Sequence, residues 1–492
     1  MKRKAAVLGA GIGGLAAALR LRKAGYDITV FEAADKPGGK INEFHRDGFR
    51  FDMGPSLFTL PELVQELFRL YDKSPEAYLK VRKLDLITRY FYEDGLVLNA
   101  YGNPDRFAEE AAGKTSDSAE AVHKYLDDAR QIYDLTASNF IFKPFGLHTF
   151  FTSEFWRAAL RIQKLKVGKT MHQLNASYFK DKRLVQLFDR YATYNGSDPY
   201  KTPGTLAVIS HLEHNAGAYF PEKGIYQIVE GLYTLAKEEN IQFNFGERVL
   251  QLIRDKRKIR TVQTTQRTQD FDLVVSDADI FTVYRKMIQG VKLPKVQARQ
   301  ERSSSALIFY WGIDATFPKL DLHNILFSEN YQKEFEELFQ QKRLPSDPTV
   351  YIFISAKAVP GDAPAGRENW FVMINAPADE GQNWDYEIAE VRKRIIKKIN
   401  RMLETDIEKH ILFEEQLNPK AIERTTGSYK GSLYGNSSNN TFAAFLRHKN
   451  ETPKFKNLFF VGGSVHPGGG IPLCLSSAKI MHERIKEKQK RS

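Results

Sequence analysis

The chain is poor in cysteine and in long apolar runs, and both shortages narrow its class. It has 492 residues but a single cysteine, Cys474, so no internal disulfide and no cysteine-built metal cluster can form. This usage is typical of a reducing compartment, and we expect a cytoplasmic protein. No run of about 18 uninterrupted apolar residues occurs, which argues against a membrane-spanning helix. The sequence predicts a protein that is soluble or peripherally associated with a membrane.

Acidic residues are also fewer than basic ones, 60 against 72, which gives a formal net charge of +12. Such an excess favours nucleic acid or an anionic membrane surface as a partner. No nucleic-acid-binding motif accompanies the charge, and acids interleave with the basic residues over most of the chain, so we expect no nucleic-acid partner. A solvated basic surface and a membrane surface both stay open. The length predicts two or three domains.

The N-terminus carries a complete nucleotide-binding pattern. An apolar strand at 4–8 runs into the loop Gly9-Ala10-Gly11-Ile12-Gly13-Gly14, a helix follows, and a second strand at 28–31 ends at Glu32. Gly9, Gly11 and Gly14 supply G-x-G-x-x-G, which permits a tight turn and close approach of the backbone to a pyrophosphate. The helix N-terminus attracts phosphate, and Glu32 is placed to accept hydrogen bonds from a ribose. A glycine-rich turn that only packs a helix is the alternative, while early charged residues argue against a signal peptide.

Further glycine-rich loops favour FAD over a nicotinamide cofactor. Pro37-Gly38-Gly39-Lys40 and Phe51-Asp52-Met53-Gly54-Pro55 follow soon after Glu32, which suggests a chain that wraps the cofactor again. Near the C-terminus a short strand at 457–461 leads into the glycine-rich run 462–472 and then a helix. We expect the two ends of the chain to hold one FAD, with a plain Gly/Pro connector as the alternative for the second loop.

These features together resemble the phytoene desaturase family of FAD-dependent carotenoid desaturases and isomerases. The resemblance covers nearly the whole chain, and its most specific part is His466-Pro467-Gly468-Gly469-Gly470-Ile471-Pro472. Gly463 stands where related flavin amine oxidases usually carry an acid, which disfavours an amine oxidase. The C-terminal run and the loop 431–438 look more like the branch that desaturates an already conjugated carotenoid at its acyclic end. For that branch the polar side chains of 436–439 could hydrogen-bond a terminal hydroxyl; a surface turn is the alternative.

The resemblance implies a fold and a set of cofactor residues. The fold is α/β, with a Rossmann-like FAD-binding domain of the glutathione-reductase and amine-oxidase type and a second, substrate domain of mixed β-sheet and helices. We expect a discontinuous FAD domain from 1–75, 222–290 and 440–492, and a membrane-facing substrate domain from 76–221 and 291–439. The cofactor-binding residues are expected to be Gly9, Gly11, Gly13, Gly14, Glu32, Ala33, Gly39, Lys40, Gly54, Pro55, Val249, Gly462, Gly463, Gly470 and Ile471.

The chemistry that the resemblance implies is removal of two hydrogens from a carotenoid, with the flavin as hydride acceptor. We expect 3,4-desaturation of γ-carotene or its 1-hydroxy derivative; a phytoene desaturase that produces lycopene, a polyene cis-trans isomerase and a non-catalytic carotenoid-binding protein are the alternatives. A base for the proton need not be strong, and the candidates are His466 and Glu213, with His211 and His214 beside the latter. The histidines lack the further ligands that a metal requires, so we expect no metal. The oligomeric state stays open.

One interval suggests how an apolar substrate reaches the protein. Between Phe142 and Leu174, aromatic and aliphatic residues interleave with lysines and arginines. This is the composition of an amphipathic segment at a membrane interface, although aromatics at helical spacing also occur in protein cores. We therefore expect a membrane surface as a partner.

Overall fold

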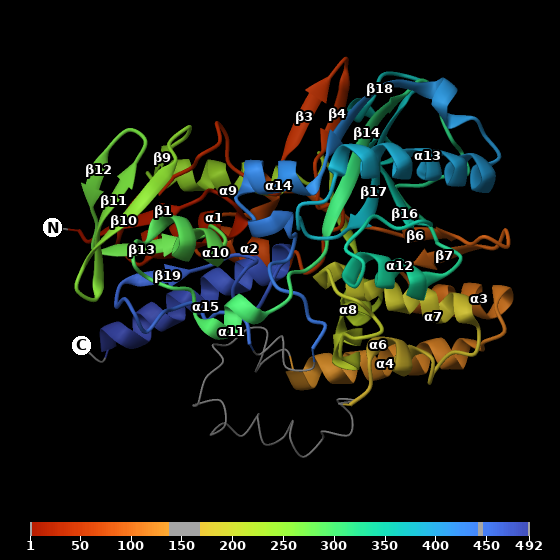
Figure 1. Cartoon of the computed structure of the whole chain (residues 1–492), viewed down its shortest axis with the longest axis horizontal. Coiled ribbons are helices and arrows are strands. Elements are labelled where there is room, and N and C mark those ends of the chain that lie inside the picture. The colour runs from red at the N-terminus through yellow and green to blue at the C-terminus, as the bar shows by residue number, and fades with distance from the viewer. Residues whose placement is uncertain (1, 137–167, 441–445, 491–492) are drawn as a thin grey trace.

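A parallel β-sheet forms one half of the protein in the computed structural model, which describes residues 2–136, 168–440 and 446–490 (Figure 1). Its strand order is β19-β13-β1-β2-β9, with β1 in the centre. The strands are β1 (Lys4–Leu8), β2 (Asp27–Phe31), β9 (Gln242–Asn244), β13 (Leu273–Ser276) and β19 (Leu458–Phe460). Ala5 and Val7 of β1 pack into one core while Ala6 and Leu8 pack into another. Burial on both faces explains why this strand is apolar without alternation.

Helices cover one face of the parallel sheet and a small antiparallel sheet covers the other. The helices are α1 (Ile12–Lys23), α2 (Glu62–Arg69), α9 (Gln227–Glu238) and α15 (Ile471–Lys490). α1 packs along α15, so the first and last helices of the chain lie side by side (Figure 1). The antiparallel sheet consists of β10 (Val249–Asp255), β11 (Lys258–Thr264) and β12 (Thr268–Asp270).

A seven-stranded mixed sheet forms the other half, in the order β18-β14-β17-β16-β15-β6-β7. Its strands are β6 (Leu86–Phe91), β7 (Val97–Tyr101), β14 (Ser305–Ile313), β15 (His323–Leu326), β16 (Val350–Ile354), β17 (Glu368–Ala376) and β18 (Ile411–Leu417). Every residue of β14 is buried. Leu307, Phe309 and Trp311 pack in the core that includes α13 (Trp384–Leu403), whereas Ile308 and Tyr310 pack in the core shared with the parallel sheet.

Shorter elements complete the two halves. A helical layer lies below the mixed sheet in Figure 1 and comprises α3 (Pro104–Lys114), α4 (Ala119–Thr136), α6 (Met171–Asn175), α7 (Lys182–Asp189), α8 (Val208–His211) and α12 (Tyr331–Phe339). Two further sheets have two antiparallel strands each: the hairpin of β3 (Glu43–Arg46) with β4 (Phe49–Asp52), and the distant pair β5 (Val81–Lys83) with β8 (Tyr219–Pro221). The remaining helices are α10 (Ile280–Thr282), α11 (Lys295–Arg299) and α14 (Pro419–Thr426).

The predicted fold class is confirmed: a Rossmann-like parallel sheet stands beside a mixed sheet with its own helices. All strands of the parallel sheet come from 1–75, 222–290 and 440–492, and all strands of the mixed sheet come from 76–221 and 291–439. The division into domains at those boundaries stays a prediction. Of the interval 142–174, only 168–174 lies inside the described residues. Among the helices that the structure describes, none is long and apolar enough to cross a membrane.

Candidate functional site

The first glycine loop has the close packing that its pattern predicts. The N–H of Gly9 donates to the carbonyl of Phe31 at 2.8 Å, which joins the loop to the end of β2. A Cβ at Gly14 would collide with the carbonyl oxygen of Gly9, so only glycine lets α1 sit this close to β1. α1 begins after Gly11, and no side chain caps its first N–H groups. Uncapped N–H groups at a helix start form a site for an anion.

Glu32 is held at the mouth of this loop by two backbone donors. Its carboxylate accepts from the N–H of Ala10 at 2.7 Å and from the N–H of Ala34 at 2.9 Å. Each carboxylate oxygen keeps a further lone pair, which suits a ribose hydroxyl. The N–H of Glu247 donates to the carbonyl of Glu32, which brings the start of β10 and Val249 to the same place. Ala33, next to Glu32, is exposed.

Asp277 is a residue of this site that the sequence analysis did not single out. It follows β13, the strand that pairs directly with β1. Its Oδ2 lies 2.5 Å from the place of a Cβ at Gly11, and its Oδ1 lies 2.6 Å from the place of one at Gly13. Burial raises the pKa of Asp277 to about 7; the N–H of Gly14 and the ammonium of Lys40 oppose this shift. The signal available in the sequence was an acidic residue directly after an apolar strand, at 273–276, that could pair with the first strand.

The second glycine loop meets the first. A Cβ at Gly13 would lie 3.0 Å from the backbone nitrogen of Gly462, and one at Gly462 would collide with Oδ1 of Asp277. Within the second loop, a Cβ at Gly463 would lie 3.2 Å from the Cα of Gly469. The loop ends at Ile471, the buried first residue of α15, and Gly470 just before it is exposed. The structure therefore brings together the loops from the two ends of the chain.

The loop 431–439 packs on the second glycine loop, and its polar groups already have protein partners. A Cβ at Gly435 would lie 2.9 Å from the Cα of Ser464. Asn436 accepts from Arg302, and the side chains of Ser437, Ser438 and Asn439 bond to residues 195, 198 and 301. The loop is thus buried rather than a surface turn, and these bonds leave less capacity for a substrate hydroxyl than its sequence suggests.

Two cations, the partly buried Lys40 and the buried Arg447, fix this loop against the glycine loops. Lys40 donates from Nζ to the carbonyl of Leu433 at 2.6 Å, and burial lowers the pKa of its ammonium. Arg447 donates to the carbonyls of Tyr434 and Asn436, each at 2.9 Å, and burial lowers its pKa to about 10. A Cβ at Gly39 would lie 3.4 Å from the Cα of Gly11. Lys40 thus ties the loop 37–40, which lies against the first glycine loop, to the loop 431–439.

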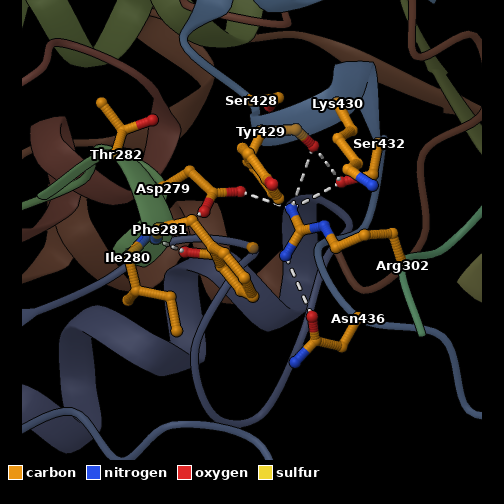
Figure 2. Close-up of polar contacts among 12 residues, drawn as sticks. Asp279, Ile280, Phe281, Thr282, Arg302, Ser428, Tyr429, Lys430, Ser432 and Asn436 are labelled. Carbon is orange, nitrogen blue, oxygen red and sulfur yellow. Dashed lines mark hydrogen bonds and ion pairs between the residues drawn. The ribbon is translucent and has the colours of Figure 1, made fainter. Parts of the chain in front are cut away.

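Figure 2 shows a third cation, the buried Arg302, and its contacts with Asp279, Ser432 and Asn436. Its Nη2 lies 2.6 Å from Oδ2 of Asp279 and 2.6 Å from Oγ of Ser432, while its Nη1 donates to Asn436 at 2.9 Å. Asp279 in turn caps α10. The side chains of Arg302 and Asp279 are each 6% exposed, so the pair is shielded from solvent. It joins the segment after β13 to the loop 431–439.

A cavity of about 240 Å³ lies beside Arg302. Its lining includes four cationic side chains and two acidic ones: Arg285, Arg302, Lys342, Lys430, Glu301 and Glu380. Such a charged lining does not suit a hydrocarbon, because burying apolar surface against charges gains little. The cavity is therefore a poor candidate for a polyene.

The two candidate bases lie on different parts of the chain. Glu213 is fully buried after α8, accepts from the hydroxyls of Tyr191 and Tyr194, and lies 3.5 Å from Nη2 of Arg190. His466 is half-buried in the second glycine loop, and its backbone N–H donates to the carbonyl of His448.

The histidines near Glu213 are held in the neutral form. Burial lowers the pKa of His214 to about 4, and it also lowers the pKa of His211. His214 Nε2 lies 2.8 Å from the hydroxyl of Tyr191. Neither histidine is therefore charged near neutral pH, which excludes them as cationic groups at this cluster.

A chain of polar contacts leads from the mixed sheet to the loop at Gly54 and Pro55. His323 Nδ1 lies 2.8 Å from the hydroxyl of Tyr351, which lies 2.6 Å from Oγ of Ser56. Burial lowers the pKa of His323 to about 3, so this imidazole is neutral. Pro55 is exposed, whereas a Cβ at Gly54 would lie 3.8 Å from the ring of Phe371. Sequence reasoning missed this contact because its members are far apart along the chain.

The residues present fit FAD. The uncapped N-terminus of α1 offers N–H donors to a pyrophosphate, and the absence of a side chain at Gly14 lets this helix start pack close to β1. Glu32, at the end of β2, is placed to accept hydrogen bonds from the adenosine ribose. In the part of the chain that the structure describes, no group of three or more His, Cys, Asp or Glu side chains could hold a metal ion.

Comparison with known proteins decides the family. The model of the family described as flavin containing amine oxidoreductase matches residues 12–485. The chain belongs to this family. It is therefore an oxidoreductase whose cofactor is FAD. A 1-hydroxycarotenoid 3,4-desaturase from Flavobacterium sp. (strain P99-3) is 47% identical over 98% of this chain and 99% of its own length. A 4,4'-diaponeurosporene oxygenase from Staphylococcus haemolyticus is 30% identical over 98% and 97%.

These relatives confirm the resemblance to carotenoid desaturases that the motifs indicated. Solved structures agree on the fold. A putrescine oxidase bound to putrescine aligns with a TM-score of 0.64 and 17% identity over 100% of this chain and 100% of its own. A cyclohexylamine oxidase from Brevibacterium oxydans aligns with a TM-score of 0.62 and 15% identity over 100% of both chains. At these identities the likeness is one of fold alone.

Proposed function

We propose that this flavoenzyme is a carotenoid desaturase that introduces a double bond at the acyclic end of a carotenoid, by 3,4-desaturation of γ-carotene or its 1-hydroxy derivative. The observation that carries the proposal is the 47% identity, over nearly the full length of both chains, to a 1-hydroxycarotenoid 3,4-desaturase. The residues of the second glycine loop resemble those of the same branch.

When bound, the flavin supplies the hydride acceptor that no side chain provides. The chain's own task is to hold that cofactor at the two glycine loops and to present an apolar surface to the polyene. Tyr310, Tyr351 and Phe371 pack with Met53, next to Gly54, in the core that the two sheets share. We propose that the conjugated chain lies beside this buried aromatic cluster, because flat rings pack against a polyene and exclude water.

We propose that Glu213 accepts the proton whose loss from the substrate completes the double bond, with His466 as the alternative base. Oε1 and Oε2 of Glu213 are oriented by the hydroxyls of Tyr191 and Tyr194. Nη2 of Arg190 lies 3.5 Å from Oε1 of Glu213 and forms an ion pair with it. A polyene cation is acidic, so a carboxylate held in this way is basic enough.

We also propose that the protein acts at the cytoplasmic surface of a membrane, because its proposed substrate is a hydrocarbon. A forty-carbon hydrocarbon gains roughly 30 kcal/mol by staying out of water, at about 0.8 kcal/mol per buried CH₂. Transfer through water is therefore negligible, and the polyene enters from lipid. The net charge of +12 and the basic interval 142–174 favour an anionic leaflet.

Incubation with a panel of carotenoids tests the proposal. The purified flavoprotein is mixed in liposomes with phytoene, lycopene, γ-carotene and 1-hydroxy-γ-carotene, and products are identified by mass and absorption. We expect a product with two fewer hydrogens and one more conjugated double bond from γ-carotene or its hydroxy derivative, and little lycopene from phytoene. Efficient formation of lycopene would identify a phytoene desaturase, and a product of unchanged mass would identify an isomerase. Absence of flavin and of turnover would indicate a carotenoid-binding protein.

A further inference from the structure

A carboxylate stands on the side of the glycine loop that the cofactor has to approach. The second glycine of G-x-G-x-x-G lacks a side chain so that the pyrophosphate can come close to the backbone. At Gly11 the place of the missing Cβ lies 2.5 Å from Oδ2 of Asp277, and at Gly13 it lies 2.6 Å from Oδ1. Asp277 therefore shares the space beside Gly11 with the group that the loop binds.

An ionised carboxylate in this place would repel a pyrophosphate. The ionisable groups that face Asp277 come from three other segments: Glu32 at the end of β2, Lys40 in the following loop, and Cys474 in α15. The first turn of α1 contributes no acidic side chain, only the N–H of Gly14. Burial raises the pKa of the Cys474 thiol to about 12, so this group is neutral. One acid and one ammonium then remain around Asp277, and burial keeps its pKa near 7.

We propose that Asp277 contacts the pyrophosphate of FAD as a neutral carboxylic acid and donates a hydrogen bond to it, so that the protein takes up a proton when FAD binds. This rests on the assignment of the glycine loop as the FAD site. A protonated carboxyl has one O–H donor, whereas the ionised form only accepts. The pyrophosphate adds negative charge beside Asp277 and raises the pKa of its carboxyl further in the complex.

The sign of the pH dependence follows from this linkage. Below pH 7 the carboxyl is already protonated in the free protein, and FAD binds with full affinity. Above pH 7 the free protein has to gain a proton on binding, so the dissociation constant rises by about tenfold per pH unit until the pKa of the complex is reached.

The test uses the purified holoenzyme, diluted at pH values from 6 to 9, with released FAD measured by its fluorescence. We expect the wild-type dissociation constant to rise about tenfold per unit above pH 7. Asp277→Asn, whose amide donates without titrating, should bind FAD with a flat profile over this range. Asp27→Asn removes an exposed acid at the other end of β2 and should keep the wild-type slope. If the asparagine variant does not fold, Asp277→Ser, a smaller donor, is measured instead.

Two results would overturn the proposal. One is a wild-type dissociation constant for FAD that does not change between pH 6 and 9; this result is obtained without any variant. The other is a wild-type slope in the asparagine or serine variant, which would assign the proton to another group. A third result would reject the assignment of the glycine loop as the FAD site: wild-type protein that holds no FAD at any pH. The flavin content at pH 6 separates this result from the other two.

Discussion

At the scale of single residues, Gly11 is a position where we expect a side chain to block cofactor binding. A Cβ there would lie 2.5 Å from Oδ2 of Asp277, at the start of α1. We expect Gly11→Val to abolish FAD binding, because its methyl groups fill the space that the pyrophosphate needs. Flavin content per chain is measured from the visible absorption of the purified protein.

Gly113→Val is the matched control for this substitution. Gly113 is an exposed residue of α3, and a Cβ there meets nothing within 4 Å. This variant should keep its flavin and should not lose stability through helix propensity, because valine is a better helix former than glycine. A yellow, fully loaded Gly11→Val protein would reject the glycine loop as the FAD site.

Glu213 provides a second prediction at this scale. Glu213→Gln should lower the single-turnover rate of desaturation by about 10²-fold or more, the range for a general base, while flavin content stays unchanged. Glu334→Gln is the control, since Glu334 is a buried acid that accepts from Ser328 and Thr349 in the same half of the protein. Equal rates for the two variants would exclude Glu213 as the base and leave His466.

At the scale of elements, the loop 431–439 depends on the buried Arg302. Arg302→Leu leaves Asp279 without its cation, and breaking a buried pair in this way costs about 3–5 kcal/mol. The same change releases Ser432 and Asn436. Because this loop packs on the second glycine loop, we expect both the free energy of unfolding in urea and the affinity for FAD to fall.

Arg260→Leu is the control for the buried pair. Arg260 and its partner Asp270 are 67% and 59% exposed, so removing this surface ion pair should change the free energy of unfolding by about 1 kcal/mol or less. Equal losses for the two variants would show that the Arg302 pair does not hold the loop.

At the scale of the whole molecule, charge and substrate together predict binding to an anionic membrane surface. Basic residues near such a surface each add about 1 kcal/mol. We expect the protein to sediment with liposomes that contain anionic lipid and to stay in the supernatant with neutral ones. Replacing Arg157, Arg161 and Lys164 by glutamine should weaken the sedimentation.

The control removes the same charge elsewhere. Arg254, Lys256 and Lys258 are exposed on the small antiparallel sheet, and their replacement by glutamine should leave sedimentation nearly unchanged. Equal effects of the two triple variants would show that net charge alone binds the membrane. Equal recovery in the supernatant with and without anionic lipid would remove the membrane as a partner.

The sequence by itself determined the parts whose geometry is local. The strand at 4–8, the glycine loop, the helix after it and Glu32 are close together along the chain, and their backbone requirements fix both the fold of this unit and its cofactor. The family resemblance extended this to the second glycine loop and to the reaction class. The predicted elements agree with the structure, and the predicted cofactor and reaction class agree with the relatives, because each rests on motifs of a few consecutive residues.

Only the tertiary structure decided which distant residues meet at the cofactor loops. Asp277, Arg302 and Arg447 are separated by tens to hundreds of residues from the glycines they approach, and no periodicity marks them. The loop 431–439, which its sequence presents as polar and open, is buried because Arg302, Arg447 and Lys40 donate hydrogen bonds to its oxygens. The reason is physical: backbone geometry follows from neighbouring residues, whereas the environment and the pKa of a buried charge follow from whatever the whole fold packs around it.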